Sequence, residues 1–188
     1  MLLKLFNVLA IAWPVSEVIL GLLSRAKRAS ATVRDRGSLA FLWIMIALGL
    51  TAAHFIRLSG VGSVGVPPAL FMSVGLAFLL SGLALRWTAI LTLGRFFTPN
   101  VAIQPGQSVV RTGVYRYVRH PAYSGLLLAF LGLGVASGNW LSLLVIFIPV
   151  MAALLYRIRV EESALVEMLG REYADYCEAT KRLVPGIY

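Results

Sequence analysis

Two polar clusters stand out in this chain of 188 residues because each of them adjoins a long apolar run. The first cluster, residues 113–125, gathers tyrosines, arginines and a His-Pro pair just before one apolar run. The second, Arg157 to Glu162, directly follows another apolar run. If the two runs form a membrane hairpin, both clusters lie at the same membrane edge, where ionisable groups usually have a function. We therefore expect one polar ligand site between them.

These side chains are suited to binding a charged, partly aromatic ligand. Arg119 and His120 add donors to the free N–H groups of a helix that begins at Pro121, and such a helix start favours an anionic group. The paired glutamates can accept ribose hydroxyls or face a cation, and Arg157 can hold a carboxylate with two parallel hydrogen bonds. The structural alternatives are interfacial anchors in the first cluster and a solvated pair of Arg157 with Glu161 in the second.

The composition indicates an integral membrane protein. Hydrophobic residues make up 59% of the chain and charged residues only 13%, which is more apolar surface than a soluble domain of this size can bury. The net charge of +9 is concentrated between apolar runs, so we expect it to orient the chain in a membrane rather than to bind nucleic acid. With Cys177 as the single cysteine and two distant histidines, we expect no disulfide and no metal site.

Five apolar runs predict an all-α protein with five transmembrane helices, near residues 3–23, 38–58, 69–93, 121–137 and 140–156. The last two runs are short and predict a C-terminal helical hairpin, with a re-entrant hairpin as the alternative. Lys and Arg are concentrated in 24–37, 94–119 and the tail, which predicts an outside N-terminus and both clusters on the cytoplasmic side. We divide the chain into three N-terminal helices, 1–93, and a cofactor-binding catalytic region, 94–188.

The last thirty residues differ in composition from the apolar runs that precede them. Six of the eight acidic residues fall between Glu161 and Glu178, and apolar residues from Val160 onward recur at roughly helical spacing. This pattern predicts a cytoplasmic amphipathic helix that ends at Val184-Pro185-Gly186 and folds back over the hairpin as a lid.

Two features within the apolar runs have open alternatives. Glu17 and Arg86 either pair inside the helix bundle or extend toward the membrane surface. Gly75 and Gly82 are seven residues apart on one helix face, and they pack either within the chain or against a second copy. The oligomeric state is therefore left open.

The second half of the chain resembles the isoprenylcysteine carboxyl methyltransferases and the related phospholipid methyltransferases. The resemblance covers residues 94–188 and rests on the order and spacing of several motifs. These are Gly113-x-Tyr115, Arg119-His120-Pro121-x-Tyr123-x-Gly125, Arg157-x-x-x-Glu161-Glu162-x-x-Leu165, Gly170-x-x-Tyr173-x-x-Tyr176 and Arg182-Leu183-Val184-Pro185-Gly186-Ile187. The segment Asp35-Arg36-Gly37-Ser38 is similar to the bacterial branch, which implies a prokaryotic member in the cell inner membrane.

The resemblance implies S-adenosylmethionine as the methyl donor and a lipophilic or prenylated methyl acceptor, with membrane lipid around the protein. It implies that Arg157 and Glu161 are catalytic, with Arg157 binding the carboxyl group of the substrate. The cofactor-binding residues it implies are Gln104, Gln107, Ser108, Val109, Val110, Tyr115, Arg119, His120, Pro121, Ala122, Tyr123, Glu161 and Glu162. Gln107 departs from the family pattern, because many relatives have His there.

The resemblance implies attack of a substrate carboxylate on the sulfonium methyl group. A carboxylate is ionised at neutral pH and needs no general base. One alternative keeps the cofactor and changes the acceptor to a phospholipid amine, with Glu162 as its base, or to a small thiol or phenol. A second is a nicotinamide-dependent membrane reductase, although Leu126 stands where such reductases usually have an acidic residue. A third is a non-enzymatic membrane scaffold or small transporter.

Overall fold

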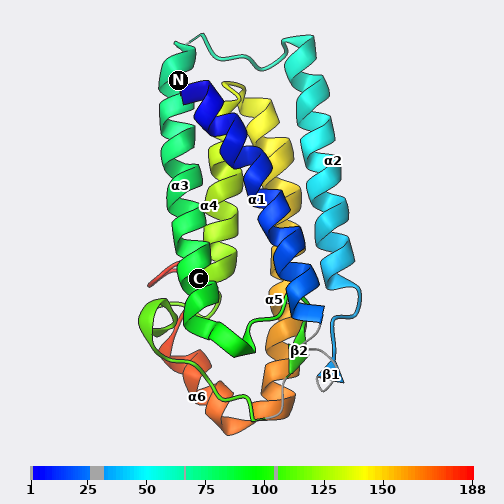
Figure 1. Cartoon of the computed structure of the whole chain (residues 1–188), viewed down its shortest axis with the longest axis vertical. Helices are drawn as coiled ribbons and strands as arrows, with labels where there is room; N and C mark the ends of the chain where they lie inside the picture. The colour runs from blue at the N-terminus through cyan, green and yellow to red at the C-terminus, as the bar shows by residue number, and fades with distance from the viewer. Residues whose placement is uncertain (1, 26–31, 66, 104–105) are drawn as a thin grey trace.

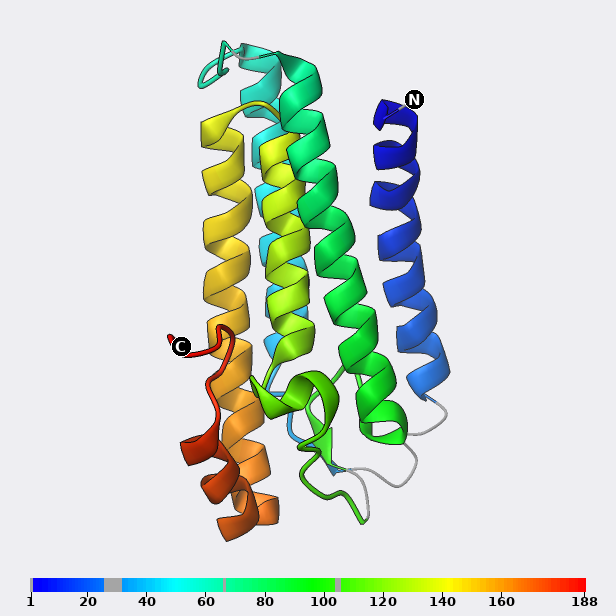
Figure 2. The ribbon, with the colours of Figure 1, turned by 90° about the vertical axis from the view of Figure 1, so that its left-hand side faces the viewer.

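The structure, a computed structural model, describes residues 2–25, 32–65, 67–103 and 106–188, and its helices form one elongated bundle (Figures 1 and 2). Five apolar helices run along its long axis. They are α1 (Leu2–Arg25), α2 (Ser38–Ser59), α3 (Pro68–Leu93), α4 (Pro121–Ala136) and α5 (Trp140–Leu169). The smaller elements are α6 (Arg171–Ala179), the 3-10 turns η2 (Gly94–Phe96) and η3 (Gly113–Arg116), and an antiparallel pair of two-residue strands, β1 (Thr32–Val33) and β2 (Ala102–Ile103).

The predicted all-α membrane fold is confirmed. In the described part of the chain, α1, α2, α3 and α5 are long and apolar enough to cross a membrane, whereas α4 is apolar but has only 16 residues. At a rise of 1.5 Å per residue, α4 is about 24 Å long, somewhat less than the hydrocarbon thickness. A full crossing by α4 stays a prediction.

Glycines let α3 and α4 approach until their backbones touch. A Cβ atom on Gly82 would lie 2.6 Å from the carbonyl oxygen of Gly125, and one on Gly75 would lie 2.7 Å from the oxygen of Gly132. No side chain fits at such distances, so these glycines are required by packing between the two helices. The face that carries Gly75 and Gly82 is thus used inside the chain.

The helices of the C-terminal segment begin and end at other residues than the sequence predicted. The helix expected to begin near Val160 is the continuation of α5, which runs unbroken for 30 residues to Leu169. Gly170, with φ of 56°, then turns the chain back, and α6 ends at Ala179, before the predicted Val184. The reversal occurs at Gly170 because glycine adopts positive φ without steric cost.

The two ends of the bundle are unlike each other. The α2–α3 and α4–α5 connections lie at one end, and β1, β2, η3 and α6 lie at the other (Figures 1 and 2). The described basic residues of the three Lys- and Arg-rich segments therefore gather at one end of the bundle, as the charge pattern predicted. The cytoplasmic orientation of that end stays a prediction.

Candidate functional site

A cleft with about 890 Å³ of empty volume lies at the basic end of the bundle, among the loop after α3, the start of α4, the end of α5 and α6. We call it the polar cleft. Many of the predicted site residues line it, although they come from separate segments. These are Gln107, Ser108, Val109, Val110, Tyr115, Arg119, His120, Ala122, Tyr123, Arg157 and Glu161.

Two of the predicted cofactor residues that the structure describes, Pro121 and Glu162, do not line the polar cleft. Pro121 is fully buried at the first turn of α4, where its missing N–H leaves no bond unmade. Glu162 is on the face of α5 turned away from the cleft. Gln104 lies outside the described residues. Of the adjacent glutamates, therefore, only Glu161 faces a ligand in this cleft.

The carboxylate of Glu161 is held at the cleft wall by Tyr123. The Tyr123 hydroxyl donates to Glu161 Oε2 at 2.7 Å, and the His120 ring stacks on the Tyr123 ring with centroids 5.5 Å apart. The side chain of Glu161 is 29% exposed, so it retains acceptor capacity toward the cleft. A fixed carboxylate of this kind suits a hydroxyl pair or a cationic group.

Glu162 holds together the framework behind the cleft. Its oxygens accept hydrogen bonds from Arg119 Nε at 3.0 Å and Arg182 Nε at 2.9 Å, and His120 Nε2 lies 3.2 Å away. These partners join α5 to the start of α4 and to the C-terminal segment. A buried carboxylate with three such partners is a structural cross-link.

Several of the donors that the sequence predicts to be free at the start of α4 already have partners. The N–H groups of Tyr123 and Ser124 donate to the His120 carbonyl, and the His120 N–H donates to the Arg182 carbonyl at 2.9 Å. The Ser124 hydroxyl also donates to the Leu183 carbonyl, at 2.6 Å. The His120 carbonyl and the residues after α6 thus use these groups, so the start of α4 offers fewer donors to an anion than the sequence predicted.

The aromatic roof of the cleft comes from α6 and η3. Tyr173 and Tyr176 are buried, and the Tyr176 hydroxyl donates to the Tyr115 carbonyl at 2.6 Å. Burial raises the pKa of Tyr176 to about 12 despite the opposing effect of Arg119, so this hydroxyl keeps its proton at neutral pH. The Val109 N–H, expected to face a cofactor, lies 3.2 Å from Glu172 Oε1 and donates to it. The roof is therefore fixed by its own hydrogen bonds.

Arg157 is 3% exposed and already strongly bonded. Its Nε donates to the Tyr123 hydroxyl at 2.9 Å, and its Nη1 donates to Asp35 Oδ1 and Ser38 Oγ, each at 2.8 Å. Nη2 donates to the Pro99 carbonyl. A guanidinium has five N–H groups, so one remains for a ligand, and the predicted two-bond clamp on a substrate carboxylate is wrong as stated.

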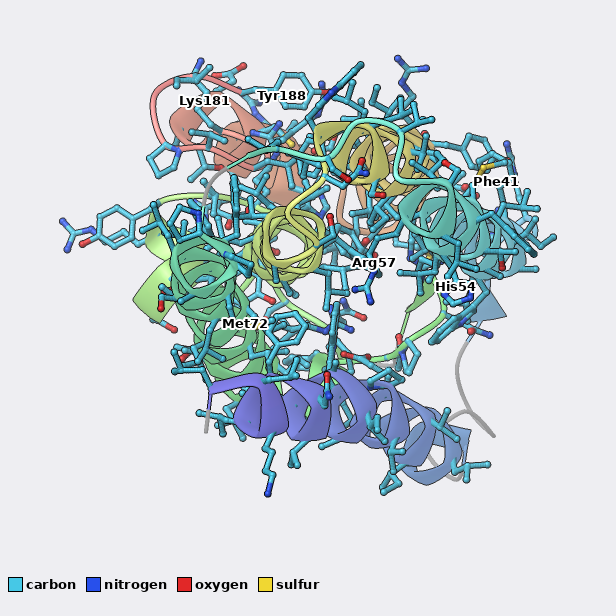
Figure 3. The ribbon with its side chains drawn as sticks, turned by 90° about the horizontal axis from the view of Figure 1, so that it is seen from above. Phe41, His54, Arg57, Met72, Lys181 and Tyr188 are labelled. Carbon is cyan, nitrogen blue, oxygen red and sulfur yellow. The ribbon has the colours of Figure 1, made fainter. Side chains whose placement is uncertain are left out.

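A second hollow, with about 1,620 Å³ of empty volume, opens between α1 and α2. We call it the apolar groove. The helices contact one another in the order α2, α5, α4, α3 and α1, which leaves α1 facing α2 across the groove (Figure 3). Residues such as Leu42, Ile46 and Leu50 of α2 and Phe130 of α4 line it. The groove and the polar cleft share Phe97, Thr98, Asn100, Tyr123 and Arg157, so they meet at these residues.

The outer wall of the groove is α1, which an ion pair joins to α3. Arg86 of α3 donates to both carboxylate oxygens of Glu17, with Nη2 to Oε2 at 2.6 Å, and also to the Ala122 carbonyl. The Trp13 ring packs on Phe130 with centroids 5.1 Å apart. Of the two alternatives for Glu17 and Arg86, the structure shows the pair.

Sequence reasoning missed one residue at the junction of the hollows, Asn100, and one residue behind that junction, Asp35. Asn100 lines both, and its Oδ1 is buried without a hydrogen-bond partner in the described structure. Asp35 pairs with Arg157, although the sequence motif that contains it was given no role. Asp35 is the single acidic residue in the basic segment 24–37, and that exception is a signal that could have drawn attention to it.

The chain matches known proteins of one family. The family model described as the isoprenylcysteine carboxyl methyltransferase family matches residues 74–167. An Arabidopsis thaliana protein named protein-S-isoprenylcysteine O-methyltransferase B is 36% identical over 113 residues, 59% of this chain and 57% of that protein. A Schizosaccharomyces pombe protein-S-isoprenylcysteine O-methyltransferase is 31% identical over 119 residues, 62% of this chain and 50% of that protein.

A solved structure shows the same likeness. The structure of a eukaryotic intramembrane Ras methyltransferase, an isoprenylcysteine carboxyl methyltransferase, has a TM-score of 0.54 and 28% identity, covering 80% of this chain and 50% of that one. This chain thus spans about half the length of the curated relatives it matches. The relatives described here are eukaryotic and give no support to the expected prokaryotic membrane. Because the family model covers half of its 188 residues, the chain belongs to the isoprenylcysteine carboxyl methyltransferase family.

Proposed function

We propose that this protein is a membrane-embedded methyltransferase that uses S-adenosylmethionine to methylate the carboxylate of an isoprenylcysteine or a similar lipophilic acid. The observation that carries the proposal is the meeting of the polar cleft and the apolar groove at Tyr123 and Arg157. A water-soluble donor and a lipid acceptor must reach one point from different solvents. Two hollows that share one wall satisfy this requirement.

The residues of the polar cleft fit S-adenosylmethionine. Glu161 provides a carboxylate for the ribose hydroxyls or the positive charge, and Tyr115 and Tyr173 provide flat surfaces for the adenine. The unpartnered Oδ1 of Asn100 is suited to accept a hydrogen bond from the ammonium group of the cofactor. When bound, the cofactor supplies an electrophilic methyl group.

The apolar groove fits the prenyl chain of the acceptor. Between Leu39 and Leu50, α2 lines the groove over eleven residue steps, which correspond to about 16 Å of helix. Because the groove is bounded by α1 and α2, the chain can enter sideways from the bilayer. The acceptor carboxylate then lies near Arg157, at the end where the cleft begins.

The residues at the junction position the acceptor and need not remove a proton. The remaining N–H of Arg157 orients one carboxylate oxygen, and the other oxygen is left to attack the methyl group. Tyr123 holds Glu161 and Arg157 in fixed relation through its hydroxyl. Positioning and exclusion of water by the roof of α6 are the contributions we assign to this chain.

A phospholipid amine is a poorer acceptor for this site. An amine must lose a proton, and Glu162, the base expected from sequence, is bonded to Arg119 and Arg182 outside the cleft. The carboxylate of Glu161 already accepts a hydrogen bond from the Tyr123 hydroxyl. A small thiol or phenol would leave the large apolar groove without a role. The carboxylate acceptor therefore explains more of the site, and we place the site on the cytoplasmic side, where the cofactor is available.

Calorimetric titration of S-adenosylmethionine into the detergent-purified protein tests the cofactor. We expect a dissociation constant in the micromolar range and a loss of about 30-fold in Glu161→Ala, the size expected for hydrogen bonds to a charged group. Glu167→Ala is the matched control, because Glu167 lies on the same helix but pairs with Arg34 at the exposed surface. Absence of binding by the folded wild-type protein would contradict the proposal.

A further inference from the structure

Asp35 reaches Arg157 through a tight turn before α2. Arg36 and Gly37 both have positive φ, 47° and 75°, and they turn the chain so that Asp35 and Ser38 both face Arg157. Asp35 Oδ1 accepts from Arg157 Nη1 at 2.8 Å and from Ser38 Oγ at 2.7 Å. Its Oδ2 accepts from the Leu39 N–H at 3.2 Å. The pair with Arg157 therefore links the first half of the chain to the site.

The pair is located behind Arg157 as viewed from the two hollows. Arg157 lines both the polar cleft and the apolar groove, whereas Asp35 and Ser38 line neither. Ser38 is fully buried, and the Asp35 side chain is 13% exposed. A ligand in either hollow thus meets the guanidinium and not the carboxylate that balances it.

Asp35 is ionised at neutral pH. Burial alone would raise the pKa of its carboxyl group, but the hydrogen bonds from Ser38 and Leu39 and the charge of Arg157 hold that pKa below its usual range. Its negative charge at 2.8 Å offsets the positive charge of Arg157, in a setting where water screens little.

We propose that Asp35 is a positioning residue that offsets the charge of Arg157, so that an acceptor carboxylate is oriented by one N–H without being bound tightly. The inference rests on the proposed function, because it concerns the same acceptor. A carboxylate bonded twice to an uncompensated arginine would be stabilised in the ground state and would attack more slowly. Asp35 lies outside residues 74–167, where the family model matches, so this role does not follow from the match.

A purely structural role is the alternative to exclude. Asp35 accepts from the Leu39 N–H and so stabilises the first turn of α2. If that were its whole role, replacing it would change stability but would not change how the protein discriminates a charged ligand from a neutral one. The ratio of two affinities separates the roles.

The experiment measures binding of N-acetyl-S-farnesylcysteine and of its methyl ester to the full chain in detergent by calorimetry. In Asp35→Asn, we expect the acid to bind about tenfold more tightly and the ester to bind as in the wild type, since one compensating charge is lost. Steady-state assays should then show KM and kcat for the acid falling together. The cofactor affinity should stay the same.

Two further variants separate charge from folding. Asp35→Glu keeps the charge and should keep the acid-to-ester ratio close to the wild-type value. If Asp35→Asn does not fold, Asp35→Ser is the replacement, because Ser is also neutral and its hydroxyl oxygen is a hydrogen-bond acceptor. An unchanged ratio in a folded neutral variant overturns the inference while the proposed function stands. Wild-type protein that binds neither ligand overturns the acceptor assignment, and this inference with it.

Discussion

The polar cleft and the apolar groove are built in different ways. The cleft is closed by hydrogen bonds among α5, α6, the start of α4 and residues 180–188, with Glu162 at their centre. The groove has α1 as its outer wall, and only 6% of the α1 span is buried, compared with 39% of the α5 span. A charged ligand thus meets fixed donors and acceptors, whereas a lipid chain meets a wall with few attachments. The difference suits a specific cofactor and a flexible, apolar acceptor.

The largest effect should come from breaking the cross-link of the cleft. Glu162→Gln keeps the size of the side chain but leaves Arg119, Arg182 and His120 without their carboxylate. Breaking a buried ion pair costs about 3–5 kcal/mol, which corresponds to roughly 10 °C in Tm for a chain of this size. Thermal unfolding in detergent measures the shift. Glu167→Gln, at an exposed pair, should change Tm by less than about 2 °C.

The sequence predicted the cleft better than the groove. The motifs at 113–125 and 157–162 are short segments in which the site residues are close together in the sequence. Most of the expected residues from these motifs do line one hollow. The spacing of the motifs could not predict which hydrogen bonds their side chains form. The sequence therefore did not show that Glu162 is bonded behind the cleft or that Arg157 has only one N–H left for a ligand. Those bonds depend on tertiary partners such as Asp35, far away in the sequence.

The groove was hidden from sequence reasoning because its walls come from apolar spans with no motif. The residues of α2 that line it and those that face lipid are equally hydrophobic. Glu17 and Arg86 were noticed as charged residues in apolar runs, but only the fold shows that they attach α1 to α3. The length of α5 was underestimated for a related reason, since its apolar and amphipathic stretches join without a break at the membrane edge.

The second effect concerns the wall of the groove. Glu17→Gln weakens the main polar attachment of α1, and we expect about tenfold weaker binding of N-acetyl-S-farnesylcysteine with cofactor affinity unchanged. Because so little of α1 is buried, the Tm should fall less than in Glu162→Gln. Calorimetry with each ligand and thermal unfolding measure both quantities. A Tm loss equal to that of Glu162→Gln would contradict the contrast between the two hollows.

A third prediction fills the groove without touching its charges. Leu50→Trp places a larger side chain at the groove wall and should raise KM for the prenylated acid about fivefold, while the cofactor affinity stays constant. Leu48→Trp is the matched control, because Leu48 is on the same helix, is 58% exposed and lies outside the groove. Equal effects of the two substitutions would show that the acceptor does not occupy this groove.

The smallest effect is a pH dependence at the junction. The folded pKa of Asp35 lies below its ordinary value of 3.8, so its contribution to stability is fully present above that value and is lost as pH falls through the folded pKa. The difference in Tm between wild type and Asp35→Asn should therefore shrink between pH 5 and pH 3. Thermal unfolding at each pH measures it. A difference that grows on acidification would contradict the charge balance at Arg157.

Transfer of a labelled methyl group tests most directly whether the two hollows form one site. The reconstituted protein is mixed with methyl-labelled S-adenosylmethionine and N-acetyl-S-farnesylcysteine, and the lipid product is treated with base. A carboxyl methyl ester releases its label as volatile methanol, and this is the result we predict, with activity reduced in both Glu161→Ala and Leu50→Trp. Label that stays on the lipid after base, or no transfer by a folded protein that binds both ligands, would contradict carboxylate methylation at this junction.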